Sequence, residues 1–143
     1  VRECLKWCSE KEKMIMTKEW KELYDAARSV IAAKKLSKNM FVGEVGAAVL
    51  SSKGNIYTGV CIDTACSLGF CAERNALSTM FTNGEYEIVK VCAVYKDGSV
   101  MPPCGACREF MMQMGETAKD IEVLVSNDGR TVRLAQLMPE YQY

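Results

Sequence analysis

Two short cysteine-containing segments constrain this chain more than any other feature of its sequence. The first, residues 71–74, is CAER, and the second, residues 103–108, is PCGACR. Each stands at the start of a predicted helix, and Cys104 and Cys107 are one helical turn apart, so both sulfur atoms can face one point. Cys71 can approach that point from its own helix. Three thiolates repel one another unless a cation lies between them, and Zn²⁺ suits such ligands. The spacing therefore predicts a zinc site.

The residues beside these cysteines suit chemistry at such a metal. Glu73 lies two positions beyond Cys71, so its carboxylate need not bind the metal from the same side. A free carboxylate beside a three-ligand zinc is what water activation requires, because zinc lowers the pKa of water toward about 7 and the carboxylate carries the proton. Arg74 and Arg108 are placed to offset the negative charge that three thiolates leave on Zn²⁺.

Composition excludes several other classes of protein. The 143 residues include no histidine, which rules out Ser-His-Asp and Cys-His catalysis. Eighteen basic and eighteen acidic side chains cancel, so no global positive field favours nucleic acid or an anionic membrane surface. No apolar run approaches the roughly 18 residues of a membrane span. Because Val1–Ile15 is too charged for a secretory signal, the eight cysteines indicate thiol or metal chemistry in a reducing compartment, and we expect the cytoplasm.

The pattern of apolar residues predicts alternating helices and strands. The expected elements are, in order, a helix from Thr17, strands Val45–Leu50 and Ile56–Val60, a helix from near Cys71 to Asn83, strand Ile88–Tyr95, a helix from near Cys104 to Gly115, and strands Ile121–Val125 and Thr131–Leu134. This order predicts an α/β fold, a three-layer α/β/α sandwich around a mixed five-stranded sheet with an antiparallel C-terminal hairpin. We expect one domain, residues 17–143, after an N-terminal extension, residues 1–16, whose role the sequence does not specify. The extension contains Cys4 and Cys8, which carry little weight as ligands.

Five segments, in a fixed order, give the sequence its resemblance to a known family. They are residues 45–48 (VGAA), 57–60 (YTGV), 71–74 (CAER), 103–108 (PCGACR) and 137–139 (LMP). From about Val45 to the C-terminus the chain resembles the cytidine deaminase family, in its small branch with three cysteine ligands. The resemblance implies a zinc-dependent hydrolase that converts a cytidine- or deoxycytidine-like 4-aminopyrimidine nucleoside to the uridine product and ammonia. It also implies a homotetramer in which neighbouring subunits complete each site.

The resemblance also implies roles for individual residues. The implied zinc ligands are Cys71, Cys104 and Cys107. Glu73 corresponds to the proton shuttle, and Arg74 resembles the arginine that hydrogen-bonds the thiolates. The backbone of Ala72 and of Pro102 matches the positions that contact the carbonyl and amino groups of the pyrimidine ring.

The sequence departs from the family where the sugar is held. Nucleoside deaminases usually carry an Asn-x-Glu pair that binds the ribose, and here Cys61 and Asp63 stand at the matching positions. We interpret both as substrate-binding, although a cysteine is a weak hydrogen-bonding group compared with an amide. Gly43-Glu44 replaces the familiar Phe-Pro, and the loop Ala65–Phe70 is one residue short. These departures predict a retained reaction with a shifted sugar preference. The nearest alternative is a deaminase of a modified aminopyrimidine nucleoside, like blasticidin S deaminase of the same superfamily.

Three other interpretations stay open. A structural zinc site closed by Cys61 or Cys66 would stabilise a non-catalytic interaction module and would need no Glu73. A redox pair of Cys104 and Cys107 leaves the third cysteine and Glu73 unexplained. Glu73 by itself fits an ordinary first-turn glutamate that favours the helix dipole. The fourth ligand of the metal separates an enzyme from a structural site, since water indicates the first and a fourth sulfur the second. A redox pair would instead show reversible dithiol oxidation without zinc.

Overall fold

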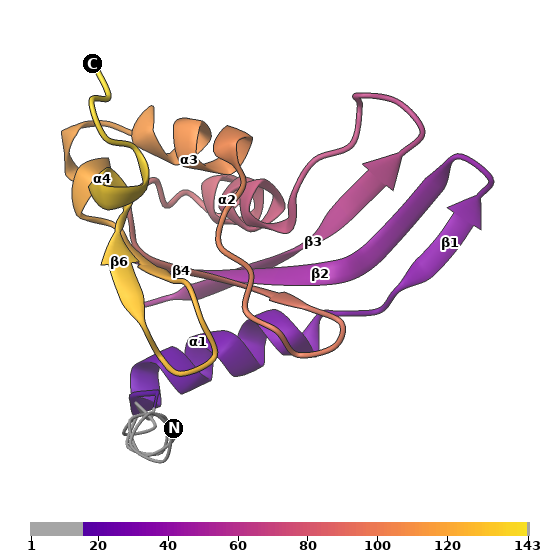
Figure 1. Ribbon diagram of the computed structural model, residues 1–143, viewed down its shortest axis with the longest axis horizontal. Coiled ribbons are helices and arrows are strands. Elements are labelled where there is room, and N and C mark those ends of the chain that lie inside the picture. The colour runs from indigo at the N-terminus through magenta and orange to yellow at the C-terminus, as the bar shows by residue number, and fades with distance from the viewer. Residues whose placement is uncertain (1–15, 143) are drawn as a thin grey trace, which may run out of the picture.

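The computed structural model of the protein describes residues 16–142. Its elements, labelled in Figure 1, are α1 (Lys18–Ser29), β1 (Lys34–Ser37), β2 (Met40–Ser51), β3 (Ile56–Thr64), α2 (Ala72–Thr82), β4 (Ile88–Tyr95), α3 (Gly105–Met112), the 3-10 helix η1 (Glu116–Asp120), β5 (Glu122–Leu124), β6 (Thr131–Arg133) and α4 (Leu134–Leu137). The expectations for the N-terminal extension, with Cys4 and Cys8, fall outside the described residues except at Met16.

The strands form one mixed sheet organised around β2. β3 pairs with one edge of β2. Both β1 and β4 pair with the other edge, one after the other along its length. β1 lies beside residues 40–42 and β4 beside residues 45–51, and all three pairings are antiparallel. β4 then pairs in parallel with β5, which forms an antiparallel pair with β6. The mixed sheet and the antiparallel C-terminal hairpin expected from the sequence are confirmed.

The sheet has six strands, one more than the five expected. The additional strand is β1, whose sequence KKLS has only one apolar residue and so lacks the alternation of apolar and polar side chains that identifies a strand. β2 also begins at Met40, before the expected Val45. At the other end, Leu134 begins a helix instead of continuing β6. The reason is that the side chain of Gln136 accepts a hydrogen bond from the Arg133 N–H at 2.8 Å and caps α4.

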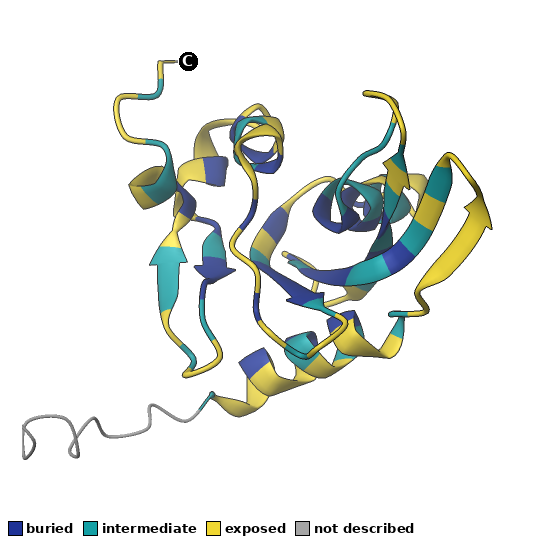
Figure 2. Ribbon diagram, turned by 45° about the vertical axis from the view of Figure 1, so that its right-hand side comes forward, coloured by how far each residue is buried: buried dark blue, intermediate teal, exposed yellow. Residues whose placement is uncertain are grey.

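Helices cover both faces of the sheet, which confirms the three-layer α/β/α arrangement (Figure 1). Because side chains alternate along a strand, β2 contributes to both cores. Ala47 and Val49 pack with α2 and α3 on one face, and Ala48 packs with α1 on the other. Figure 2 shows the buried residues concentrated along these two interfaces.

Two glycines let the helices approach the sheet closely. A Cβ atom at Gly46 would collide with the carbonyl oxygen of Ala27 in α1, and one at Gly59 would collide with the backbone nitrogen of Ala76 in α2. A side chain at either position would push the helix away from the sheet. The close approach of α2 fixes the position of its N-cap residue, Cys71, relative to the sheet.

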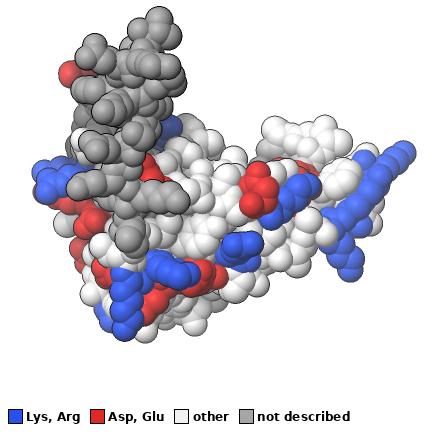
Figure 3. All heavy atoms as spheres, turned by 60° about the horizontal axis from the view of Figure 1, so that its bottom comes forward, with Lys and Arg blue, Asp and Glu red and all other residues white. Residues whose placement is uncertain are grey.

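The surface that carries α1 has side chains of both charges. Figure 3 shows basic and acidic groups interspersed over it, with basic groups gathered at the end where β1 lies. The described residues visible in that view form no continuous basic surface of the kind that binds nucleic acid. No helix within residues 16–142 is long and apolar enough to cross a membrane.

Candidate metal centre and substrate cavity

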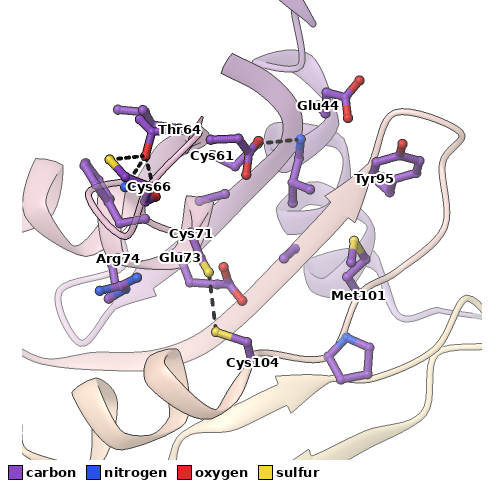
Figure 4. A pocket seen from close by; sticks show the side chains of 18 residues that line it. Glu44, Cys61, Thr64, Cys66, Cys71, Glu73, Arg74, Tyr95, Met101 and Cys104 are labelled. Carbon is purple, nitrogen blue, oxygen red and sulfur yellow. Dashed lines mark hydrogen bonds between the residues drawn. The ribbon is translucent and has the colours of Figure 1, made fainter. Parts of the chain in front are cut away.

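The N-termini of α2 and α3 bring three cysteines together. Cys71 is the N-cap of α2, Cys104 is the N-cap of α3, and Cys107 follows in the first turn of α3. Their Sγ atoms all lie within 4.8 Å of one another, and those of Cys71 and Cys104 are 3.4 Å apart (Figure 4). A tetrahedral Zn²⁺ with Zn–S bonds of about 2.3 Å holds its sulfur ligands about 3.8 Å apart. The spacing of the three sulfur atoms thus fits a zinc ion.

The local charges at the cluster also fit a cation. Burial opposes ionisation of Cys104, but the backbone N–H of Cys107, the thiols of Cys71 and Cys107 and the backbone N–H of Ala106 together outweigh it and lower the pKa of Cys104. Burial raises the pKa of Cys71 and that of Cys107. Three thiols this close do not all ionise unless a positive charge joins them. A bound metal ion would supply that charge.

Arg74 lies against the same sulfur atoms. Burial acts to lower the pKa of Arg74, but hydrogen bonding to Cys71 and attraction to Cys107 raise it overall. Within the described residues, its Nε is buried without a hydrogen-bond partner. A buried arginine donor left over in this position fits a neighbouring cluster that carries negative charge.

Arg108 does not face the thiolates, contrary to the expectation from the sequence. It donates from Nε to the carbonyl oxygen of Pro103 and from Nη1 to that of Leu137. Its side chain extends past the first turn of α3, toward the segment before the helix and toward α4. Arg108 therefore stabilises backbone carbonyls instead of offsetting the charge of the sulfur atoms.

Within the described residues, no fourth cysteine joins the cluster. The Sγ of Cys61 accepts a hydrogen bond from the Val45 N–H and donates one to Asp63 Oδ2, both at 3.3 Å. Cys66 is exposed, and its Sγ lies 3.6 Å from the Thr64 hydroxyl. A three-cysteine set leaves an open coordination position, which is what distinguishes catalytic from structural zinc sites.

Glu73 stands beside the cluster in the first turn of α2. It is only 5% exposed, and it lines the same cavity as Cys71 and Cys104. Burial raises the pKa of the Glu73 carboxyl above its ordinary value. A glutamate that only favours the helix dipole has no need of burial, whereas burying a carboxylate costs free energy. Its position therefore favours a chemical role.

The cluster opens onto a cavity of about 490 Å³. Figure 4 shows Glu73 beside the sulfur atoms of Cys71 and Cys104, with Cys61 and Glu44 across the cavity. Of the residues assigned to the site from the sequence, Arg108 and the fully buried Cys107 do not line the cavity, and the others do. The lining residues so identified are Cys61, Asp63, Cys71, Ala72, Glu73, Arg74, Pro102 and Cys104.

Glu44 is a cavity residue that sequence reasoning did not assign. The register between β2 and β3 breaks between Val42 and Gly46, and Gly43 has a φ of 76°, so the chain forms a β-bulge there. Bulges turn side chains toward functional sites, and here Glu44 lines the cavity and pairs with Lys96. A glycine before a charged residue inside a strand was the signal in the sequence. The cavity has further lining residues that the sequence did not identify, among them Thr64, Phe70, Tyr95 and Met101.

Known proteins resemble this chain in sequence and in fold. A family model for the cytidine and deoxycytidylate deaminase zinc-binding region matches residues 19–124, which include both cysteine segments. Cytidine deaminase from Halalkalibacterium halodurans is 33% identical over 100 residues, covering 67% of this chain and 74% of that protein. Blasticidin-S deaminase from Bacillus cereus is 31% identical over 106 residues, covering 66% and 74%. The crystal structure of cytidine deaminase from Mycobacterium leprae matches with a TM-score of 0.71 at 28% identity, covering 85% of this chain and 98% of that one.

Proposed function

Because this chain belongs to the family of cytidine and deoxycytidylate deaminases with a zinc-binding region, we propose that it is a zinc-dependent hydrolase that releases ammonia from a 4-aminopyrimidine nucleoside. The substrate is cytidine-like or deoxycytidine-like, and the product is the corresponding uridine. One observation carries the proposal: Glu73 is buried in one cavity with Cys71 and Cys104, beside three sulfur atoms within 4.8 Å of one another. A carboxylate next to an open metal position is what hydrolytic deamination requires.

Three cysteines would hold the metal, namely Cys71, Cys104 and Cys107. When bound, Zn²⁺ supplies a Lewis acid that makes water nucleophilic near neutral pH. Arg74 stabilises the negative charge of the thiolates through the contacts that raise its own pKa.

Glu73 moves the proton in the proposed mechanism. Its carboxylate accepts a proton from the attacking water and delivers it to the amino nitrogen, so that ammonia leaves when the bond between ring carbon and nitrogen breaks. The backbone of Ala72 and of Pro102, both on the cavity wall, holds the carbonyl and amino groups of the ring. This orientation brings the ring carbon to the attacking oxygen.

A second candidate substrate is a modified aminopyrimidine nucleoside of the blasticidin S type. Two observations favour it. The relative from Bacillus cereus is named blasticidin-S deaminase. The pair Cys61 and Asp63 on the cavity wall also differs from the usual ribose-binding pair.

We propose a homotetramer in which neighbouring subunits complete each cavity. Two strongly exposed apolar side chains beside the cavity support it. Leu68 is 80% exposed in the loop between the lining residues Cys66 and Gly69, and Phe41 is 42% exposed opposite Asp63 in the sheet. Contact with a neighbouring subunit would remove these apolar side chains from water.

We further propose that residues 17–143 form the catalytic domain and that residues 1–16 are an extension to it. We place the protein in the cytoplasm. Six described cysteines are free thiols, which suits a reducing compartment.

An ammonia-release assay on the zinc-loaded protein tests the function. Cytidine, deoxycytidine, cytosine and blasticidin S are the substrates, each with and without a chelator. We expect chelator-sensitive release from at least one nucleoside. A protein that binds zinc but releases ammonia from none of them would instead be a non-catalytic zinc-stabilised interaction module.

A further inference from the structure

We propose that Cys61 is a positioning residue: its thiol fixes the orientation of the Asp63 carboxylate, the group that the resemblance to nucleoside deaminases already places at the sugar. The inference rests on the proposed function and extends it to the sugar end of the cavity. The resemblance to nucleoside deaminases implies that residue 61 contacts the ribose directly. In this structure the Cys61 thiol instead hydrogen-bonds to Val45 and Asp63.

The first argument is that the Cys61 thiol is fully used within the protein. Cys61 is 6% exposed, and its sulfur accepts from the Val45 N–H and donates to Asp63 Oδ2. A thiol has a single proton to donate. Burial, the largest effect on its pKa, raises the pKa of Cys61, so the group stays protonated and continues to donate to Asp63 at neutral pH.

The second argument is that the bulge in β2 is built around this thiol. β2 and β3 are in register up to the pair of Val42 with Ile62 and again from the pair of Gly46 with Val60. Three residues of β2, Gly43–Val45, therefore stand opposite one residue of β3, which is Cys61. The bulge takes the Val45 N–H out of the regular ladder with β3 and directs it to the sulfur atom.

The third argument concerns what Asp63 offers to a ligand. Asp63 lies two residues after Cys61 on β3 and so projects from the same face of the strand; it lines the cavity. Within the described residues, its carboxylate pairs with no lysine or arginine. An ionised carboxylate only accepts hydrogen bonds. A sugar hydroxyl can donate to it, whereas a sugar without donors leaves it unsatisfied.

The neighbouring polar groups do not take over this task. The other carboxylate at this end of the cavity, Glu44, is paired with Lys96. The Thr64 hydroxyl donates to the Cys66 carbonyl oxygen and accepts from the Gly69 N–H. Discrimination at the sugar therefore depends on Asp63, and the orientation of Asp63 depends on Cys61. A site built to hydrogen-bond a hydroxyl discriminates strongly against analogues that lack it.

Steady-state kinetics on cytidine and 2′,3′-dideoxycytidine test the proposal. The zinc-loaded variants are Cys61→Ala, Cys61→Ser, Asp63→Ala and the double variant, with Cys92→Ala as a matched buried cysteine. Cys92 packs in the other core, against α1. We expect Cys61→Ala to raise KM for cytidine by roughly threefold to tenfold, the effect of one lost hydrogen bond, and to raise KM for the dideoxy compound less. Serine, which keeps a donor, restores much of the loss.

The double variant decides whether Cys61 acts through Asp63. If it does, Cys61→Ala adds nothing to the KM for cytidine once Asp63 is alanine. Additive effects in the double variant, or an equal rise in KM for both substrates, would overturn the inference while leaving deaminase activity in place. If the parent protein released no ammonia from any aminopyrimidine tested, the proposed function would be overturned, and this inference with it. Equal zinc content and melting temperature across the variants exclude misfolding as the cause.

Discussion

The Nε of Arg108 lies 2.8 Å from the carbonyl oxygen of Pro103, five residues before it in the chain. This hydrogen bond closes the turn immediately before Cys104, whose own side chain makes no capping hydrogen bond to α3. The same guanidinium reaches Leu137 in α4 at 3.4 Å. One half-buried side chain thus connects the segment that positions a sulfur atom to the C-terminal helix.

We predict that Arg108→Gln lowers the free energy of unfolding by about 1–3 kcal/mol, because a hydrogen bond from a charged group to a partly buried carbonyl is lost. Zinc should also leave faster to a chromophoric chelator, since Cys104 follows Pro103 directly. Denaturant unfolding and chelator kinetics measure the two effects. The control is Arg133→Gln, which removes an exposed ion pair with Asp120 and should cost at most about 1 kcal/mol. Equal effects of the two substitutions would show that Arg108 is an ordinary surface arginine.

Glu73→Gln should fold and retain zinc but lose turnover by at least roughly 10²-fold. The reason is that an amide of the same shape cannot accept and deliver the proton. The measurement is kcat for ammonia release, beside zinc content by atomic absorption. Glu22→Gln, an exposed glutamate on α1, is the control and should behave as the parent protein does. Unchanged turnover in Glu73→Gln would contradict the proposed mechanism.

Cys104→Ala should lose zinc and melt at a lower temperature, because binding of the metal and folding share free energy. Cys66→Ala is the matched control. Cys66 also lines the cavity and is exposed like Cys104, but it does not belong to the sulfur cluster. Metal content and melting curves with and without chelator provide the comparison. Equal zinc loss in both variants, or a parent protein whose melting ignores the chelator, would contradict the three-cysteine site.

The sequence predicted the cysteine cluster because the required information is local. A three-residue spacing at the start of one helix places Cys104 and Cys107 on the same side. The start of the helix at Cys71 is likewise marked by the residues next to it in the sequence. The helices and the C-terminal hairpin follow from the same short-range patterns. Residues Lys34–Ser37 carry no such pattern, since only one of the four is apolar, and only the open edge of β2 makes them a strand.

The roles of Glu44 and Arg108 could not be predicted, because they depend on longer-range relationships. Glu44 reaches the cavity through a bulge, and the register of β2 against β3 is set by both strands together. Arg108 was expected at the thiolates on grounds of charge alone. Its actual partners are backbone carbonyls, which every residue has and which no sequence pattern marks.

Acid should selectively weaken the connection that Glu85 makes between the end of α2 and the β2–β3 turn. Glu85 is buried, and its Oε1 accepts from Asn55 Nδ2 at 2.6 Å and from the Tyr57 hydroxyl at 2.7 Å. The hydroxyls of Ser51 and Tyr57 hold the pKa of Glu85 below its ordinary value of 4.5. A carboxyl whose pKa is depressed on folding stabilises the native state above its unfolded pKa, and this stabilisation is lost as the pH falls through the folded one. Glu85→Gln should therefore be less stable than the parent at pH 7, and the difference should shrink as the pH falls below the ordinary pKa of 4.5 and through the lower pKa of the folded state. Urea unfolding at pH values on both sides of 4.5 measures the difference, with the exposed Glu87→Gln as control. A difference that does not shrink as the pH is lowered would show that the charge of Glu85 contributes nothing to the connection.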